Sequence, residues 1–196
     1  MGETSRQGTN NREVFLNITN STLGQKIQIT KERRRMRKKF VESTDFRTFL
    51  VDCYLYLNPS SYGTRIQERF RKDNGWSKVK ASDNRGDYKT EKDYVEFKVS
   101  YLGVMDTYTL KHIRPWQELD RYHVVLIDSS FDYTIYDIPK NDMNEFVDKY
   151  GSLCHGTSTA NLKNQKVEYG WDFKKNKLYE LERFIWKPSA KINKFF

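Results

Sequence analysis

The chain has 196 residues, enough for one medium-sized domain with a core of its own. An aromatic content of 15% argues against general disorder, and the presence of only two cysteines argues against a secreted disulfide scaffold, so we expect a reduced, cytoplasmic protein. The net charge of +9 favours nucleic acid as the partner, and no membrane, because no apolar run approaches the roughly 20 residues of a spanning helix.

The first 40 residues are interpreted as a basic N-terminal segment. β-Branched residues over Val14–Ile29 predict a short strand or hairpin. The densest positive patch of the chain, KERRRMRKKF, follows at residues 31–40. It is either a solvated helical face or flexible arm, or a direct contact to DNA phosphates; the second reading assigns DNA binding to Arg33, Arg34, Arg35 and Lys38.

Two helices are predicted next. The first begins at Thr44, with Ser43 or Thr44 as its N-cap, and its apolar residues recur at helical spacing until Pro59 ends it. The second covers Ser61–Lys72 and stops before the turn signal Asp73-Asn74-Gly75.

The rest of the chain mixes strands and helices, which indicates an α/β (α+β) fold in a single domain over residues 41–196. We expect strands separated by a turn over Val79–Ser100, a helix over Thr107–Leu119 bent near Pro115, strands over Tyr122–Asp128 and Tyr133–Ile138, and a helix over Asn141–Tyr150 with Gly151 as its C-cap. The region after Gly151 combines a polar loop with aromatic, strand-like patches and is treated as a C-terminal extension.

The informative stretch for chemistry is GDYKTEKDYVEFKVS, residues 86–100. In a strand, Val95, Phe97 and Val99 share one face, which must be buried, so Glu96 and Lys98 share the opposite face. The alternative is an exposed strand with a surface ion pair between these two charged residues.

The position of Asp87 depends on the hairpin register. A four-residue loop over Thr90–Asp93 makes Lys89 and Tyr94 the closing pair, and counting back brings Asp87 opposite Glu96. Two carboxylates so close repel each other unless a cation lies between them, and oxygen ligands without His or Cys favour Mg²⁺, with Mn²⁺ as a substitute. The alternative for Asp87 is a turn residue after glycine.

This stretch resembles the PD-(D/E)XK nuclease superfamily, and within it the type II restriction endonucleases. Gly86-Asp87 is followed, after eight residues, by Glu96-Phe97-Lys98. The resemblance implies metal-binding acids at Asp87 and Glu96, a catalytic lysine at Lys98, and a restriction-endonuclease-like core whose central mixed β-sheet is flanked by helices. The proline that names the motif is absent, since Gly86 precedes Asp87.

The same resemblance singles out three further residues. Members often carry a glutamate on a helix before the catalytic hairpin, which corresponds to Glu68, with Gly63 permitting close approach to a neighbour. They tend to follow the catalytic strand with a helix ending in an Arg/Gln-bearing segment, which brings Gln117 near the active site and lets Arg114 face a phosphate. The alternatives are a helical ion pair of Glu68 with Arg65, Arg71 or Lys72, and helix-surface positions for Gln117 and Arg114.

The expected function is therefore a Mg²⁺-dependent type II restriction endonuclease that cuts double-stranded DNA in a prokaryotic or phage cytoplasm. A homodimer matches palindromic DNA, and a cognate DNA methyltransferase is the expected genetic partner. Two alternatives stay open: a repair, phage or mobile-element nuclease that recognises DNA structure, and a non-catalytic basic nucleic-acid-binding module. The three histidines show no ligand spacing, which argues against a histidine-metal nuclease.

Overall fold

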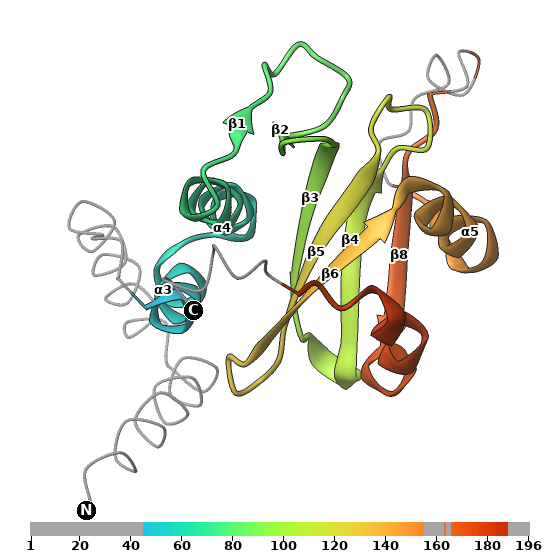
Figure 1. Cartoon of the computed structure of the whole chain (residues 1–196). Coiled ribbons are helices and arrows are strands. Elements are labelled where there is room, and N and C mark those ends of the chain that lie inside the picture. The colour runs from blue at the N-terminus through green and yellow to red at the C-terminus, as the bar shows by residue number, and fades with distance from the viewer. Residues whose placement is uncertain (1–44, 155–162, 164–165, 188–196) are drawn as a thin grey trace, which may run out of the picture.

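The computed structural model describes residues 45–154, 163 and 166–187. Two helices cover one face of a central β-sheet, and a smaller sheet with another helix covers the other face (Figure 1). The predictions for Val14–Ile29 and for the basic patch at 31–40 fall outside the described residues. Within the described ranges, no helix has the length and apolarity needed to cross a membrane.

Helices α3 (Phe46–Tyr56) and α4 (Pro59–Asp73) are the two helices expected from the sequence, with shifted starts. The N-cap of α3 is Asp45 and not Ser43 or Thr44, because the Asp45 carboxylate accepts the Thr48 N–H at 2.7 Å, where its charge also complements the helix dipole. Pro59 does not end α3; it begins α4, since a proline is tolerated in the first helical turn.

The central sheet is mixed, as the fold prediction requires. Its order is β1-β2-β3-β5-β6, and only the β3–β5 pair is parallel. Strand β5 is buried at six of its seven residues, as expected for a central strand covered on both faces. The bounds are β1 (Ser77–Lys78), β2 (Tyr88–Lys89), β3 (Tyr94–Tyr101), β5 (Arg121–Ile127) and β6 (Tyr133–Pro139).

The helix predicted over Thr107–Leu119 is wrong. After the short 3₁₀ turn η1 (Val104–Asp106), the chain forms strand β4 (Thr107–Ile113), and the residues that follow it form a turn. In TYTL the buried Tyr108 and Leu110 alternate with half-buried threonines, which is the period-two pattern of a strand built from β-branched and aromatic residues.

Strand β4 belongs to a second, antiparallel sheet of order β4-β8-β7. Its other strands are β7 (Ser152–Leu153) and β8 (Tyr169–Lys174), and the 3₁₀ segment η2 (Lys175–Phe184) follows β8. Helix α5 (Lys140–Tyr150) is confirmed to within one residue, and its C-cap is Gly151, whose N–H donates to the Val147 carbonyl at 2.7 Å.

Two apolar clusters hold these layers together. The first lies between α3, α4 and the face of the central sheet that carries Val95, Phe97, Val125 and Ile127. The second lies between the other face of β5 and β6, helix α5 and the second sheet, and includes Tyr122, Leu126, Trp171 and Phe173. The opposite face of β3 is thus turned toward β4, and this face carries the charged side chains of β3, Glu96 and Lys98.

Candidate active site

The β2–β3 hairpin has the predicted register. Lys89 pairs with Tyr94, and Thr90 and Asp93 close the loop through the Thr90 N–H, which donates to the Asp93 carbonyl at 2.9 Å. The Asp93 N–H donates in turn to Thr90 Oγ1 at 2.9 Å. A four-residue loop therefore fixes which β3 residues face the segment before β2.

Asp87 lies one residue before β2, just beyond the last regular residue pair between β2 and β3. Its N–H donates to the Val95 carbonyl at 2.8 Å, and its Oδ2 accepts the Phe97 N–H at 2.8 Å. Gly86 makes this approach possible: its φ is +96°, and a Cβ at this position would lie 2.6 Å from the Val95 carbonyl oxygen. The Asp87 carboxylate is therefore fixed against β3 beside Glu96.

Glu96 and Lys98 share one face of β3, and Val95, Phe97 and Val99 pack on the other, as predicted. Lys98 Nζ lies 2.8 Å from Glu96 Oε1 and 3.0 Å from the His112 carbonyl oxygen. The side chains of Lys98 and Glu96 are only 12% and 8% exposed, so the alternative of an exposed surface ion pair does not describe them. Burying such a pair costs free energy unless its geometry is good, so it is weak support for a purely stabilising role.

The electrostatics of Asp87 reflect this crowding. Burial first and the negative charge of Glu96 second raise the pKa of Asp87 to about 6. The hydrogen bond from the Phe97 N–H, the charge of Lys98 and a hydrogen bond from the Gln67 side chain oppose the rise. A cation between the two carboxylates would remove the repulsion.

Asp87 and Glu96 line a cavity of about 340 Å³ together with Glu68, Arg114 and Gln117. Gln117 is 5% exposed and lies in the turn after β4, not on a helix surface. Its Oε1 is buried without a hydrogen-bond partner among the described residues. A buried orphan acceptor costs free energy, and beside two carboxylates it suits a cation or a water bound to one.

Arg114 and Glu68 reach the same cavity but are already paired. Arg114 Nε lies 2.9 Å from Glu168 Oε1. Both oxygens of Glu68 accept from Arg71, at 2.9 and 3.1 Å, and the same arginine holds the pKa of Glu68 below its usual range. The helical ion pair considered from the sequence is therefore formed, closely with Arg71 and at 3.8 Å with Lys72.

A metal at this site would have two carboxylate ligands from the chain. Among the described residues there is no group of three or more His, Cys, Asp or Glu side chains arranged to hold an ion. Mg²⁺ keeps several waters and is often bound by one or two carboxylates plus substrate phosphates, so Asp87 and Glu96, with the orphan oxygen of Gln117 lining the same cavity, fit that requirement.

Protein-family models and curated proteins give no match to this sequence.

Three residues near the site were missed from the sequence: Gln67, His112 and Glu168. Gln67 lines the cavity and hydrogen-bonds Asp87. It lies one helical turn after Gly63, whose position for a Cβ is 3.6 Å from Val99, so the helix face that approaches β3 could have indicated it. The contact between His112 and Glu168 joins residues 56 apart, and no local pattern predicts it.

Other expected contacts fall outside the described residues. These are the predicted DNA-binding residues Arg33, Arg34, Arg35 and Lys38, and most of the polar loop that follows Cys154.

Proposed function

We propose that this chain is a Mg²⁺-dependent endodeoxyribonuclease of the PD-(D/E)XK type. The observation that carries the proposal is the convergence of Asp87, Glu96 and Lys98 on one hairpin, with both carboxylates on one cavity and the ammonium group 2.8 Å from Glu96. Two acids and a lysine around a hard cation are a sufficient minimal set for hydrolysing a phosphodiester.

Each residue has a separate role in this proposal. Asp87 and Glu96 hold the cation, which when bound neutralises charge on the phosphate and makes an attacking water more acidic. Lys98 orients that water and stabilises the negative charge that develops on the phosphate oxygens. The Phe97 N–H bond and the Gln67 side chain position the Asp87 carboxylate. Gln117 accepts a hydrogen bond from water at the cation.

The restriction-endonuclease-like core is part of the same proposal. It is supported by the central mixed sheet and by helix α4, which precedes the catalytic hairpin and packs on its apolar face. One feature departs from the resemblance: between β3 and β5 the chain forms strand β4 and no α-helix. The expected substrate is double-stranded DNA, cut to 5′-phosphate and 3′-hydroxyl ends by a homodimer, with a cognate methyltransferase as genetic partner.

The test is incubation of the purified full chain with unmethylated phage DNA, with Mg²⁺ or with a chelator. Discrete fragments with Mg²⁺ alone would support a restriction enzyme, and a smear or cleavage limited to damaged or branched DNA would support a repair or phage nuclease. Absence of metal-dependent cleavage would leave a non-catalytic nucleic-acid-binding module.

Lys98→Ala should reduce the cleavage rate by about a thousandfold, the scale of removing one transition-state-stabilising group. Lys89→Ala is the matched control, because Lys89 is exposed on the same hairpin. Since Lys98 is buried, Lys98→Gln and a thermal unfolding measurement separate loss of chemistry from loss of folding. Full activity of folded Lys98→Gln would contradict the assignment.

A further inference from the structure

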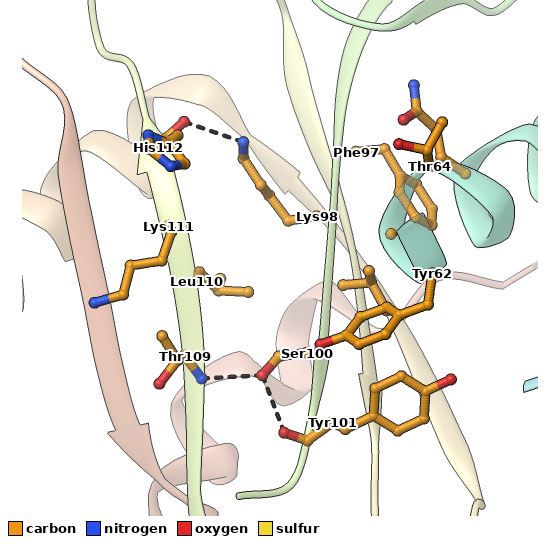
Figure 2. A pocket seen from close by; sticks show the side chains of 13 residues that line it. Tyr62, Thr64, Phe97, Lys98, Ser100, Tyr101, Thr109, Leu110, Lys111 and His112 are labelled. Carbon is orange, nitrogen blue, oxygen red and sulfur yellow. Dashed lines mark hydrogen bonds between the residues drawn. The ribbon is translucent and has the colours of Figure 1, made fainter. Parts of the chain in front are cut away.

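A second cavity lies beside the catalytic carboxylates, along the edge of β3. On β3, strand β2 pairs with Tyr94 and Val95 alone, and no strand among the described residues pairs with the same edge of β3 from Phe97 to Tyr101. A cavity of about 550 Å³ follows this edge, with α4 as one wall and β4 as the other (Figure 2). We call it the β3-edge groove. It shares Thr64 and Gln67 with the carboxylate cavity, so the two cavities are adjacent.

The charge of the β3-edge groove suits a polyanion. None of the described residues that line it is acidic, whereas Lys98 and His112 both line it. Thr64 and Thr109 add hydroxyl groups to the lining, whereas the hydroxyl group of Ser100 is already bonded to the Tyr101 carbonyl and the Thr109 N–H. Phosphate oxygens only accept hydrogen bonds, so a groove lined by an ammonium, an imidazolium and hydroxyl groups suits a nucleic-acid backbone. The carboxylates that pair with Lys98 and His112, Glu96 and Glu168, are not among the residues that line it.

His112 is held at this groove by contacts from two directions. Its Nδ1 lies 2.7 Å from Glu168 Oε2, and its carbonyl oxygen accepts from Lys98 Nζ. The Glu168 carboxylate only accepts, so Nδ1 carries a proton, and the free Nε2 donates to a phosphate oxygen when the ring is the doubly protonated imidazolium. The backbone of His112 has a φ of +55°, and the β4–β8 register shifts between Leu110 and Ile113. Such bulges re-aim side chains, and here the bulge leaves the imidazole 55% exposed.

An aromatic surface lies on the opposite wall. Tyr62, in the first turns of α4, extends its ring toward β3 (Figure 2). The ring is held edge-to-face against Tyr101, with centroids 4.9 Å apart, and it is only half-buried. A fixed, accessible ring beside a cationic groove is the arrangement that stacks an unpaired base.

From these contacts we propose that the β3-edge groove binds one unpaired DNA strand next to the bond that is cut, with a base on Tyr62 and a phosphate on His112. Residues of α4 and β4 flank the groove on both sides, and because of these two walls we assign it one backbone with its bases and not a duplex. The five residues Phe97–Tyr101 span about 13 Å, which is enough for a short stretch of a few nucleotides.

This inference rests on the proposed nuclease activity, and within it favours the nuclease that recognises DNA structure over the restriction enzyme that cuts intact duplex. The substrate is then DNA with a single-stranded stretch at the cleavage centre, such as a frayed end, a flap or a bubble. The same inference identifies His112 and Tyr62 as residues that contact the substrate and not the cation. Glu168 is then a positioning residue that acts through His112.

The experiment measures binding without catalysis. The full wild-type chain is titrated, in chelator at fixed pH and salt, into a fluorescein-labelled 15-nucleotide single strand and into the duplex of the same sequence. We expect the single strand to bind at least fivefold more tightly than the duplex. Equal or tighter binding of the duplex, or no binding of either, would overturn the proposal; the latter result would leave an extended peptide as the occupant.

Variants test the two contacts. Tyr62→Ala should weaken single-strand binding by about tenfold, within the range of one lost base stack, and Tyr62→Phe should keep it within twofold. His112→Gln should weaken it by about fivefold. Tyr179→Ala and Lys175→Gln are the matched controls, because both residues are exposed on η2 and do not line the groove. Unchanged binding in folded Tyr62→Ala and His112→Gln would refute the contacts.

The binding and cleavage assays can refute the groove proposal and the nuclease proposal independently of each other. If Mg²⁺-dependent cleavage is observed but Tyr62→Ala and His112→Gln bind and cut like the wild type, the groove proposal fails and the nuclease proposal stands. If Tyr62-dependent single-strand binding occurs with no cleavage under any metal condition, the nuclease proposal fails and the groove remains a strand-binding site.

Discussion

Substituting Asp87 by asparagine should stabilise the metal-free protein, because ionising the buried Asp87 carboxyl group lowers the free energy of unfolding. Its pKa rises from 3.8 to about 6 in the folded chain, first through burial and then through Glu96. At about 1.36 kcal/mol per pH unit this rise corresponds to about 3 kcal/mol as an upper value. The amide of the variant keeps an oxygen that can accept the Phe97 N–H, so the local backbone bond is retained.

The sign of the effect depends on pH. Below pH 3.8 the carboxyl group is protonated in both states and costs nothing, whereas above pH 6 it is charged in the folded state and the full cost applies. Asp87→Asn should therefore raise the free energy of unfolding by about 2 to 3 kcal/mol at pH 8 and by only about 0.5 kcal/mol at pH 4.

The assay is urea unfolding in chelator at pH 4 and pH 8, with Asp172→Asn as the control. Asp172 is exposed on β8, so its change should stay within about 0.5 kcal/mol at either pH. Mg²⁺ should stabilise the wild type at pH 8 and have little effect on Asp87→Asn, because the variant lacks one of the two proposed ligands. A variant less stable than the wild type at pH 8, or equally stabilised at both pH values, would refute the reasoning.

Two further changes test the structure around the hairpin. Gly86→Ala should destabilise the protein by about 2 kcal/mol or more, because φ is +96° and the new Cβ would meet the Val95 carbonyl at 2.6 Å; a thermal unfolding midpoint equal to that of the wild type would contradict this. Tyr88→Phe should cost about 1 to 3 kcal/mol in urea unfolding, because it leaves the buried His123 Nδ1 without its 2.7 Å partner, while Tyr179→Phe on the exposed surface should cost almost nothing.

The parts of the fold that the sequence predicted are those fixed by local rules. The hairpin register follows from the loop length between Lys89 and Tyr94, and α4 and β5 follow from periodicity and from an unbroken apolar run. The helix predicted over Thr107–Leu119 was wrong because the alternation in TYTL is short, and its burial depends on β8, a strand more than fifty residues later.

In the candidate site, too, contacts set by neighbouring residues were predictable and contacts between residues far apart in the sequence were not. The alternation Glu96-Phe97-Lys98 is a property of one strand, so its shared face was predictable. The Gln67 contact to Asp87 and the Glu168 contact to His112 require the packing of α4 on β3 and the pairing of β4 with β8. An amide on a helix or a glutamate in a polar stretch has no local signature of such a role.

The pairing of β4 with β8 also determines when the protein becomes complete during synthesis. Strand β4 has β8 as its only neighbour in the described sheet, and Glu168, which orients His112, directly precedes β8. After Lys98 has been added, the ribosome must still add some seventy residues before Glu168 and β8 have been synthesised. Because such long-range pairings form slowly, the nascent chain carries Asp87, Glu96 and Lys98 well before it has the strand that pairs with β4 and the glutamate that contacts His112. The candidate site is therefore complete only after β8 has been synthesised.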